Sequence, residues 1–334
     1  MPREKRRKRT SAMEIRASSA EAAGEVVEGP LTVAVTGATG FVGSKLTAAL
    51  LRRGDRVHVL TRDARRARGV FPDPRVSVFG NDAWADGIAT SDAVVNLAGE
   101  PISTRWTPEI KTAIRSSRLG ATRKVVDAIN ALPDERDEQG RGRPAVLVSG
   151  SALGYYGASQ TDRFSEESSP GKDYLARVCQ EWEEIAVGAK TRVVLLRTGI
   201  VLGSEGGALA RMLPIFKLYA GGPVGTGEQW FSWIHIDDHV NLIIDCIRNR
   251  KIEGAVNGTA PEPVTMKEMC ASLGRVVGRP SWLPVPEFAL KAILGEGASV
   301  VLEGQRVLPD KAIKEGFQFQ FTEIGDALDD IVSM

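Results

Sequence analysis

The chain has 334 residues, of which 43% are hydrophobic, and its 43 Lys and Arg residues nearly balance its 42 Asp and Glu residues. A near-neutral chain of this length can bury a large core and lacks the basic excess typical of nucleic-acid-binding proteins. Three scattered cysteines and three histidines argue against a disulfide framework and a structural metal site. No apolar run reaches the roughly 20 residues that cross a bilayer, which leaves peripheral membrane contact and the oligomeric state open.

Residues 1–30 differ in composition from the rest of the chain. A cationic run at residues 3–9 precedes Ser- and Ala-rich sequence without apolar periodicity, so we expect a tail outside the fold. Such a run is found in nucleic-acid-binding patches, but Arg- and Ser-rich sequence ahead of a folded domain also fits the remnant of a transit peptide. Ile15-Arg16-Ala17 before Ser18 resembles a plastid processing site. The tail therefore favours a plastid over the cytoplasm, with Ser18 or a neighbour as the mature N-terminus.

The folded part begins with an apolar strand that runs into three glycines, Gly37, Gly40 and Gly43. In a dinucleotide-binding turn the first glycine permits the tight turn and the second lets backbone N–H groups approach a pyrophosphate. The third lets the following helix, here predicted at residues 44–53, pack against the strand. The strand before the glycines and the helix after them together predict a bound dinucleotide.

The second predicted strand, residues 56–62, ends in Thr61 and Arg62. NAD-binding folds commonly end this strand with a carboxylate that accepts from the ribose 2′-OH, whereas a cation suits the additional phosphate of NADP. Arg62 therefore favours NADP. The alternative is a solvated arginine in a basic loop, because Arg65, Arg66 and Arg68 follow.

Strands and helices then alternate up to about Gly203, which is the pattern of a doubly wound parallel α/β sheet. Strands are predicted at 75–80, 93–99, 145–150 and 192–203, helices at 109–132 and 173–189, and a polar insert at 134–143. Residues 204–334 are predicted to form a smaller lid domain over the carboxyl ends of the strands, where ligands bind in such sheets. Its helices are predicted at 208–219, 237–249 and 265–277.

The chain contains several longer motifs, which are Thr36-Gly-Ala-Thr-Gly-Phe-Val-Gly43, Asn96-Leu-Ala-Gly99, Arg105-Trp106, Ser149-Gly-Ser151, Gly225-Thr-Gly-Glu-Gln229, Trp233-Ile-His-Ile-Asp-Asp238 and Leu302-Glu-Gly-Gln-Arg-Val-Leu-Pro309. Together these motifs resemble the extended short-chain dehydrogenase/reductases. More narrowly, they resemble an atypical epimerase-like group once described as SulA-like, whose plant members include the giant-chloroplast protein. The resemblance extends from Leu31 to the C-terminus. It implies an NADP-binding Rossmann domain at 31–203 and a C-terminal domain of unassigned function.

The same resemblance implies which residues contact the cofactor. It assigns the pyrophosphate to Gly37, Gly40, Phe41 and Val42, the 2′-phosphate to Thr61 and Arg62, and the adenosine ribose region to Leu97, Ala98 and Gly99. Arg118 and Val201 are further candidates, although Arg118 can equally be a surface arginine.

The superfamily transfers protons with a Tyr-x-x-x-Lys pair, which this chain lacks. Alignment on Trp182-Glu183 places Leu175 and Cys179 at the two positions. Ser151 is retained, and Tyr156 becomes the catalytic candidate, as an acid and not as a base, because a tyrosine without a nearby cation titrates near pH 10. The alternative for Tyr156 is a hydrogen-bonding role in a turn. Asp237 or Asp238 is expected to cap the following helix.

Sugar-nucleotide enzymes often place an arginine before the His-x-Asp-Asp segment to hold a substrate pyrophosphate. Here the segment reads Gln229-Trp-Phe-Ser-Trp233, which predicts an aromatic pocket and a flatter, more apolar substrate. Two functions follow from these observations. The first is an NADP(H)-dependent, epimerase-like oxidoreductase acting on an unknown small molecule. The second is a non-catalytic nucleotide-binding protein with a structural or regulatory role, such as plastid organisation or division.

Overall fold

The structure, a computed structural model, describes residues 26–333. The predictions made for residues 1–25, including the processing point at Ser18, lie outside the described residues. Residues 26–30, predicted to belong to a tail outside the fold, instead bond to it: Val26 forms a bridge with Asn249, and Arg248 donates to the carbonyls of Val27 and Gly29 at 2.9 and 3.0 Å. Within residues 26–333 no helix is both long enough and apolar enough to span a bilayer.

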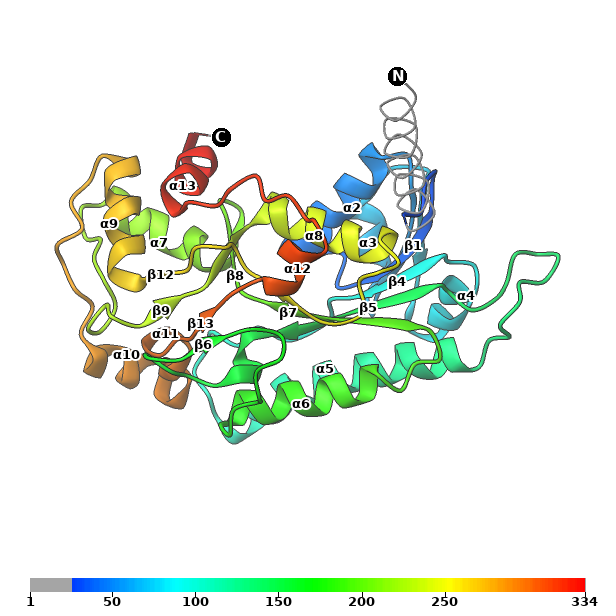
Figure 1. Ribbon diagram of the computed structural model, residues 1–334, viewed down its shortest axis with the longest axis horizontal. Coiled ribbons are helices and arrows are strands. Elements are labelled where there is room, and N and C mark those ends of the chain that lie inside the picture. The colour runs from blue at the N-terminus through cyan, green and yellow to red at the C-terminus, as the bar shows by residue number, and fades with distance from the viewer. Residues whose placement is uncertain (1–25, 334) are drawn as a thin grey trace, which may run out of the picture.

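Seven parallel strands form the central sheet, in the order β11-β7-β5-β4-β1-β2-β3 (Figure 1). Most of their residues are buried and apolar, as expected of a parallel sheet covered on both faces. The predicted doubly wound α/β fold is therefore confirmed. The strands are β1 Thr32–Thr36, β2 Arg56–Leu60, β3 Val76–Phe79, β4 Ala93–Asn96, β5 Val146–Ala152, β7 Arg192–Thr198 and β11 Gly254–Gly258.

Helices cover both faces of this sheet (Figure 1). On one face lie α4 (Trp84–Ala89), α5 (Pro108–Asn130) and α6 (Tyr174–Ala186), and on the other lie α2 (Phe41–Arg52) and α8 (Ile236–Arg248). Side-chain caps start the two long helices, because the Thr107 hydroxyl accepts from the Ile110 N–H and Asp173 accepts from the Ala176 N–H. The polar segment 134–143 is a loop between α5 and β5.

The C-terminal part has its own smaller core, which contains Leu209, Phe216, Trp233, Met269 and Leu328. Its short strands pair as β8 with β10, β9 with β12, and β6 with β13. The remaining elements are α3 Ala64–Val70, β6 Arg163–Phe164, β8 Ile200–Gly203, α7 Gly207–Lys217, β9 Trp230–Phe231, β10 Trp233–His235, β12 Val264–Thr265, α9 Met266–Val277, α10 Glu287–Leu294, α11 Ser299–Leu302, β13 Arg306–Val307, α12 Asp310–Lys314 and α13 Ile324–Ser333, with 3-10 turns at Asn81–Ala83, Leu153–Tyr156 and Gly295–Ala298.

The structure differs from the predicted elements around residue 200. The single strand predicted at 192–203 is two strands, because the chain leaves the main sheet at Gly199 and β8 pairs with β10. A Cβ on Gly199 would lie 2.7 Å from the Ser232 carbonyl oxygen, so this crossing requires glycine. Beyond Gly203, β11 and α8 return to the main sheet, so the sheet takes elements from both sides of the predicted domain boundary.

The prediction that Asp237 or Asp238 caps α8 is also wrong. His235 is the N-cap, and its Nδ1 accepts from the Asp237 N–H at 3.1 Å. Asp238 is buried and accepts instead from the backbone N–H groups of Gln320 and Phe321, both at 2.9 Å. The carboxylate of Asp238 therefore ties the chain before α13 to the start of α8.

The turn between β1 and α2 depends on close backbone packing. Gly37 has a φ of +68°, and a Cβ there would lie 2.8 Å from the backbone carbon of Leu97. A Cβ on Gly43 would lie 2.2 Å from the Gly37 carbonyl oxygen. The first and third glycines thus bring α2 directly against the end of β1.

We expect Gly43→Ala to destabilise the protein by about 1–3 kcal/mol, because the new methyl group meets backbone that cannot rotate away. Gly325→Ala in α13 is the matched control. A Cβ there meets nothing within 4 Å, so the change should be neutral or stabilise by about 0.5–1 kcal/mol. Urea unfolding of both variants measures the difference, and equal stabilities would contradict the close packing.

Candidate functional site

A first cavity of about 520 Å³ opens at the carboxyl ends of β1, β2 and β4. Its floor is the Gly37–Gly40 turn, and its walls are the segments that follow β2 and β4 together with one face of α5. Of the predicted cofactor residues, those that line it are Gly37, Gly40, Thr61, Arg62, Leu97, Ala98 and Gly99.

The start of α2 faces this cavity through Gly40. This residue is the N-cap and makes no side-chain cap bond, so the first N–H groups of α2 have no partner inside the helix. A Cβ on Gly40 would approach one protein atom, the Gly37 carbonyl oxygen at 3.2 Å. Because Gly40 lines the cavity, glycine at this position leaves the N-terminus of α2 accessible to an anion.

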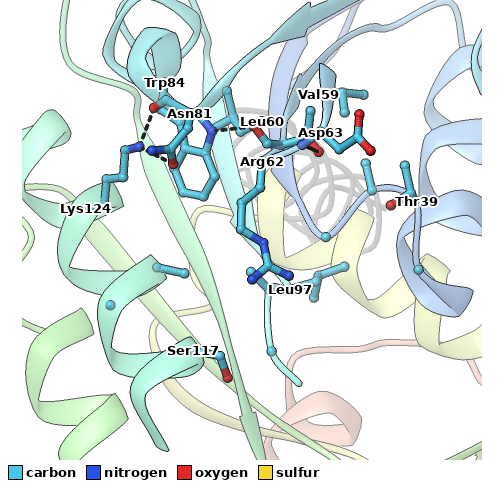
Figure 2. A pocket seen from close by; sticks show the side chains of 18 of the residues that line it. Thr39, Val59, Leu60, Arg62, Asp63, Asn81, Trp84, Leu97, Ser117 and Lys124 are labelled. Atoms are coloured by element: carbon cyan, nitrogen blue, oxygen red, sulfur yellow. Dashed lines mark hydrogen bonds between the residues drawn. The ribbon is translucent and has the colours of Figure 1, made fainter. Parts of the chain in front are cut away.

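Arg62 supplies an accessible cation at the end of β2. Its side chain is 80% exposed and its Nη2 lies 3.3 Å from Glu100 Oε1 across the cavity. An exposed pair of this kind contributes little to stability, so the guanidinium is free to reorient toward a bound phosphate. In Figure 2 the side chain extends from the end of β2 toward Leu97.

A buried hydrogen-bond chain holds the loop after β4. The Thr36 hydroxyl donates to Asn96 Oδ1 at 2.6 Å, and Asn96 Nδ2 donates to Thr122 on α5 at 2.8 Å. Thr36 also accepts from the backbone N–H groups of Leu97 and Ala98. The conformation of residues 97–99 is therefore set by polar side chains at the ends of β1 and β4.

The other four cofactor candidates lie around the first cavity but do not line it. The Phe41 ring packs against the Gly203–Gly207 turn, and Val201 is buried in the core. Phe41 and Val42 open α2, so backbone N–H groups, not side chains, are what they can offer a ligand. Arg118 packs behind Gly99, donates to the Ile114 carbonyl at 2.9 Å, and burial lowers its pKa.

The residues that form the wall of the first cavity opposite Arg62 were not predicted from the sequence (Figure 2). Lys124 Nζ lies 4.4 Å from the ring centroid of Trp84 and donates to Asn81 Oδ1 at 2.7 Å. Asp63 and Arg66, at the start of α3, complete the rim. These residues follow β2 and β3 or lie on α5, and no local sequence motif marks them.

A second cavity of about 440 Å³ opens at the carboxyl ends of β5 and β7. Leu175 lines it, at the position that the resemblance gives to the superfamily tyrosine. Cys179, at the lysine position, is 4% exposed, and burial raises the pKa of its thiol to about 12. The segment Gln229–Trp233 was predicted to line an aromatic pocket. Trp230 lines the cavity, whereas Phe231 and Trp233 are buried in the C-terminal core. Trp106 and Tyr174 are the other aromatic lining residues.

Both catalytic candidates are buried and line neither cavity. Ser151 is 4% exposed and donates to Glu183 Oε1 at 2.6 Å. Tyr156 is 3% exposed, donates to Asn257 Oδ1 at 2.7 Å and accepts from Arg197 Nη1 at 3.0 Å. Burial raises the pKa of Tyr156 to about 12. Both hydroxyls therefore belong to a buried polar network. For Tyr156 this is a hydrogen-bonding role, which was predicted from the sequence as the alternative to catalysis.

Arg197 is the centre of this network. It makes two hydrogen bonds to the Glu183 carboxylate, at 2.9 and 2.8 Å, and its Cζ lies 3.4 Å from the ring centroid of Tyr155. Burial opposes the charge of Arg197, but the hydrogen bonds and charge of Glu183 outweigh it and raise its pKa. This ion pair joins β7 to α6.

Comparison with known proteins assigns the family. Residues 33–257 match the family described as NAD dependent epimerase/dehydratase. The chain belongs to this family. Residues 285–331 match a domain of unknown function, DUF1731, and this segment contributes Glu296, Ser299, Val300 and residues 303–305 to the second cavity.

Relatives in the family occur in plants, animals and bacteria. The chain is 54% identical over 306 residues to the Arabidopsis thaliana protein "Epimerase family protein SDR39U1 homolog, chloroplastic", covering 90% of this chain and 86% of that protein. It is 36% identical over 310 residues to the human protein SDR39U1, covering 91% of this chain and all of that protein.

Solved structures support the same fold. The human SDR39U1 structure with NADPH superposes with a TM-score of 0.79 at 34% identity, covering 90% of this chain and 99% of that one. UDP-glucuronic acid 4-epimerase from Bacillus cereus gives a TM-score of 0.71 at 17% identity, covering 90% of this chain and 98% of that one, which shows a shared fold alone.

We expect Tyr156→Phe to destabilise the protein by about 1–3 kcal/mol, because Arg197 Nη1 and Asn257 Oδ1 each lose a buried partner. Tyr155→Phe is the control, since the Tyr155 hydroxyl makes no hydrogen bond in the described part of the chain and its ring remains on Arg197; this change should cost less than about 0.5 kcal/mol. Thermal unfolding compares the two. Unchanged stability of Tyr156→Phe would contradict a structural role of the Tyr156 hydroxyl and favour a catalytic one.

Proposed function

We propose that the protein is an NADP(H)-dependent oxidoreductase of the epimerase/dehydratase family that acts on a small molecule. The proposal rests on the pair of cavities along one edge of the sheet. One has a helix N-terminus and an exposed arginine, and the other is lined by aromatic rings, apolar groups and carboxylates. The proposed dinucleotide would lie in the first cavity and direct its nicotinamide toward the second.

The residues of the first cavity fit NADP(H). The N–H groups at the start of α2 would bind the pyrophosphate, and Arg62 would bind the 2′-phosphate with charge-assisted hydrogen bonds. Leu97, Ala98 and Gly99 would lie against the adenosine ribose. The human relative whose structure contains NADPH supports this choice of cofactor.

When bound, NADPH supplies a hydride to an acceptor carbon. The chain's own part is to exclude water from the second cavity and to supply a hydrogen-bond donor there. Tyr174 carries a phenol that lines this cavity, and burial raises its pKa, so the hydroxyl keeps its proton at neutral pH. Its hydroxyl donates to the Lys111 carbonyl at 2.5 Å, and a substrate oxygen would compete for that proton.

A second candidate function is nucleotide binding without catalysis, for example in plastid organisation or division. Leu175 favours it, because this side chain lines the second cavity at the tyrosine position of the superfamily and cannot transfer a proton. Both functions require the first cavity. Consumption of NADPH with any carbonyl compound separates them.

Isothermal titration calorimetry of NADPH and NADH tests the cofactor assignment. We expect NADPH to bind more tightly, and Arg62→Ala to weaken NADPH roughly tenfold or more while NADH changes little, because loss of a charge-assisted contact costs about 1.5–3 kcal/mol. Arg65→Ala, three residues further along the chain in α3 and outside the cavity lining, is the matched control and should leave both affinities unchanged. Equal affinities of the wild type for NADPH and NADH would contradict the assignment.

We further propose that the protein works in plastids, with the cytoplasm as the alternative. The Arg- and Ser-rich composition of residues 1–30 supports this compartment, as does the description of the Arabidopsis relative as chloroplastic. Residues 1–30 fused to a fluorescent protein should carry it into plastids of leaf cells, and the same fusion with the basic residues at 3–9 changed to alanine should import less. Diffuse cytoplasmic fluorescence of the first fusion would contradict the proposal.

A further inference from the structure

We propose that the second cavity selects an uncharged, flat, aromatic carbonyl compound and rejects phosphates and carboxylates. This inference deepens the proposed function and rests on it, because it names the substrate class of the same site.

The charges around the second cavity are all of one sign. Asp173, Glu296 and Glu303 line it, whereas no Lys, Arg or His does so within residues 26–333. Lys111 does not line the cavity; its Nζ pairs with the Glu296 carboxylate at 2.5 Å and lies 5.0 Å from the centroid of the Tyr174 ring. The lining itself carries three carboxylates and no cation, so its charge is net negative and repels an anionic substrate.

The flat surfaces of the cavity are aromatic rings whose polar atoms are already bonded. The indole N–H of Trp106 donates to the Ile102 carbonyl at 2.8 Å, and that of Trp230 donates to the Gln160 carbonyl at 2.9 Å. The Trp106 and Tyr174 rings meet edge to face, 5.4 Å apart. Apart from the Tyr174 hydroxyl, these three side chains offer a ligand ring surface, which favours a flat apolar partner.

The first cavity shows the opposite balance. Arg62, Arg66 and Lys124 line it together with Asp63 and Glu100. Cations suited to phosphate thus lie where the dinucleotide would bind, and carboxylates lie where the substrate would bind. This separation argues against a second nucleotide, such as a nucleotide sugar, in the second cavity.

The C-terminal segment supplies this selectivity. Glu296 and Glu303 flank α11 and belong to residues 285–331, the domain of unknown function. Glu296 and Glu303 are both exposed residues, so their carboxylates can be changed without disturbing the core. We therefore assign to this domain the outer wall of the substrate site. The reaction is then carbonyl plus NADPH plus one proton to alcohol plus NADP⁺, with the hydride added to carbon and the proton to oxygen.

A matched pair of aldehydes tests the proposal. Methyl 4-formylbenzoate is neutral, and 4-formylbenzoate differs from it by one carboxylate. We expect equilibrium dialysis with the NADPH-loaded protein to show at least about tenfold tighter binding of the ester, and loss of NADPH absorbance to follow the same preference. Equal binding of the two, or binding of neither, overturns the proposal. Selective binding without NADPH consumption supports the cavity assignment and refutes the oxidoreductase function.

Charge removal gives a second measurement. The double variant Glu296→Gln with Glu303→Gln should bind 4-formylbenzoate several-fold more tightly, relative to the ester, than the wild type does. Glu205→Gln is the matched control, because Glu205 likewise pairs with a lysine, Lys45, and lines neither cavity. An anion affinity that is the same in the double variant, the control and the wild type overturns the assignment of these carboxylates.

Discussion

The parallel orientation of the seven strands determines where both cavities lie. In such a sheet every strand ends at the same edge, so the loops after β1, β2, β4, β5 and β7 all meet along one line. The glycine turn, Arg62, the loop at 97–99 and Leu175 lie far apart in the sequence and are brought to one edge by this arrangement. Two neighbouring cavities follow from it.

The sequence predicted what local rules determine. The glycine spacing, the apolar strands and the cation after β2 act over a few residues, so the sheet and the floor of the first cavity could be inferred directly. The return of β11 to the sheet could not, because a five-residue strand with glycine at both ends carries little signal of its own. The Tyr156 environment depends on Arg197 and Asn257, and its burial is set by contacts far along the chain.

The buried network explains why the retained Ser151 and the nearby Tyr156 need not be catalytic. Ser151 and Arg197 are register neighbours on β5 and β7, and Glu183 on α6 bonds both side chains. An ionised pair of this kind is costly to bury and costly to break, so its hydrogen-bond partners are held in place. The hydroxyls of Ser151 and Tyr156 complete this network beneath the second cavity instead of lining it.

A crystal structure of the protein grown with NADPH would show whether the two cavities form one site. We expect the 2′-phosphate beside Arg62, the pyrophosphate at the start of α2, and the nicotinamide at the mouth of the second cavity, beside Leu175. A nucleotide bound elsewhere, or a nicotinamide directed away from the second cavity, would show that they do not.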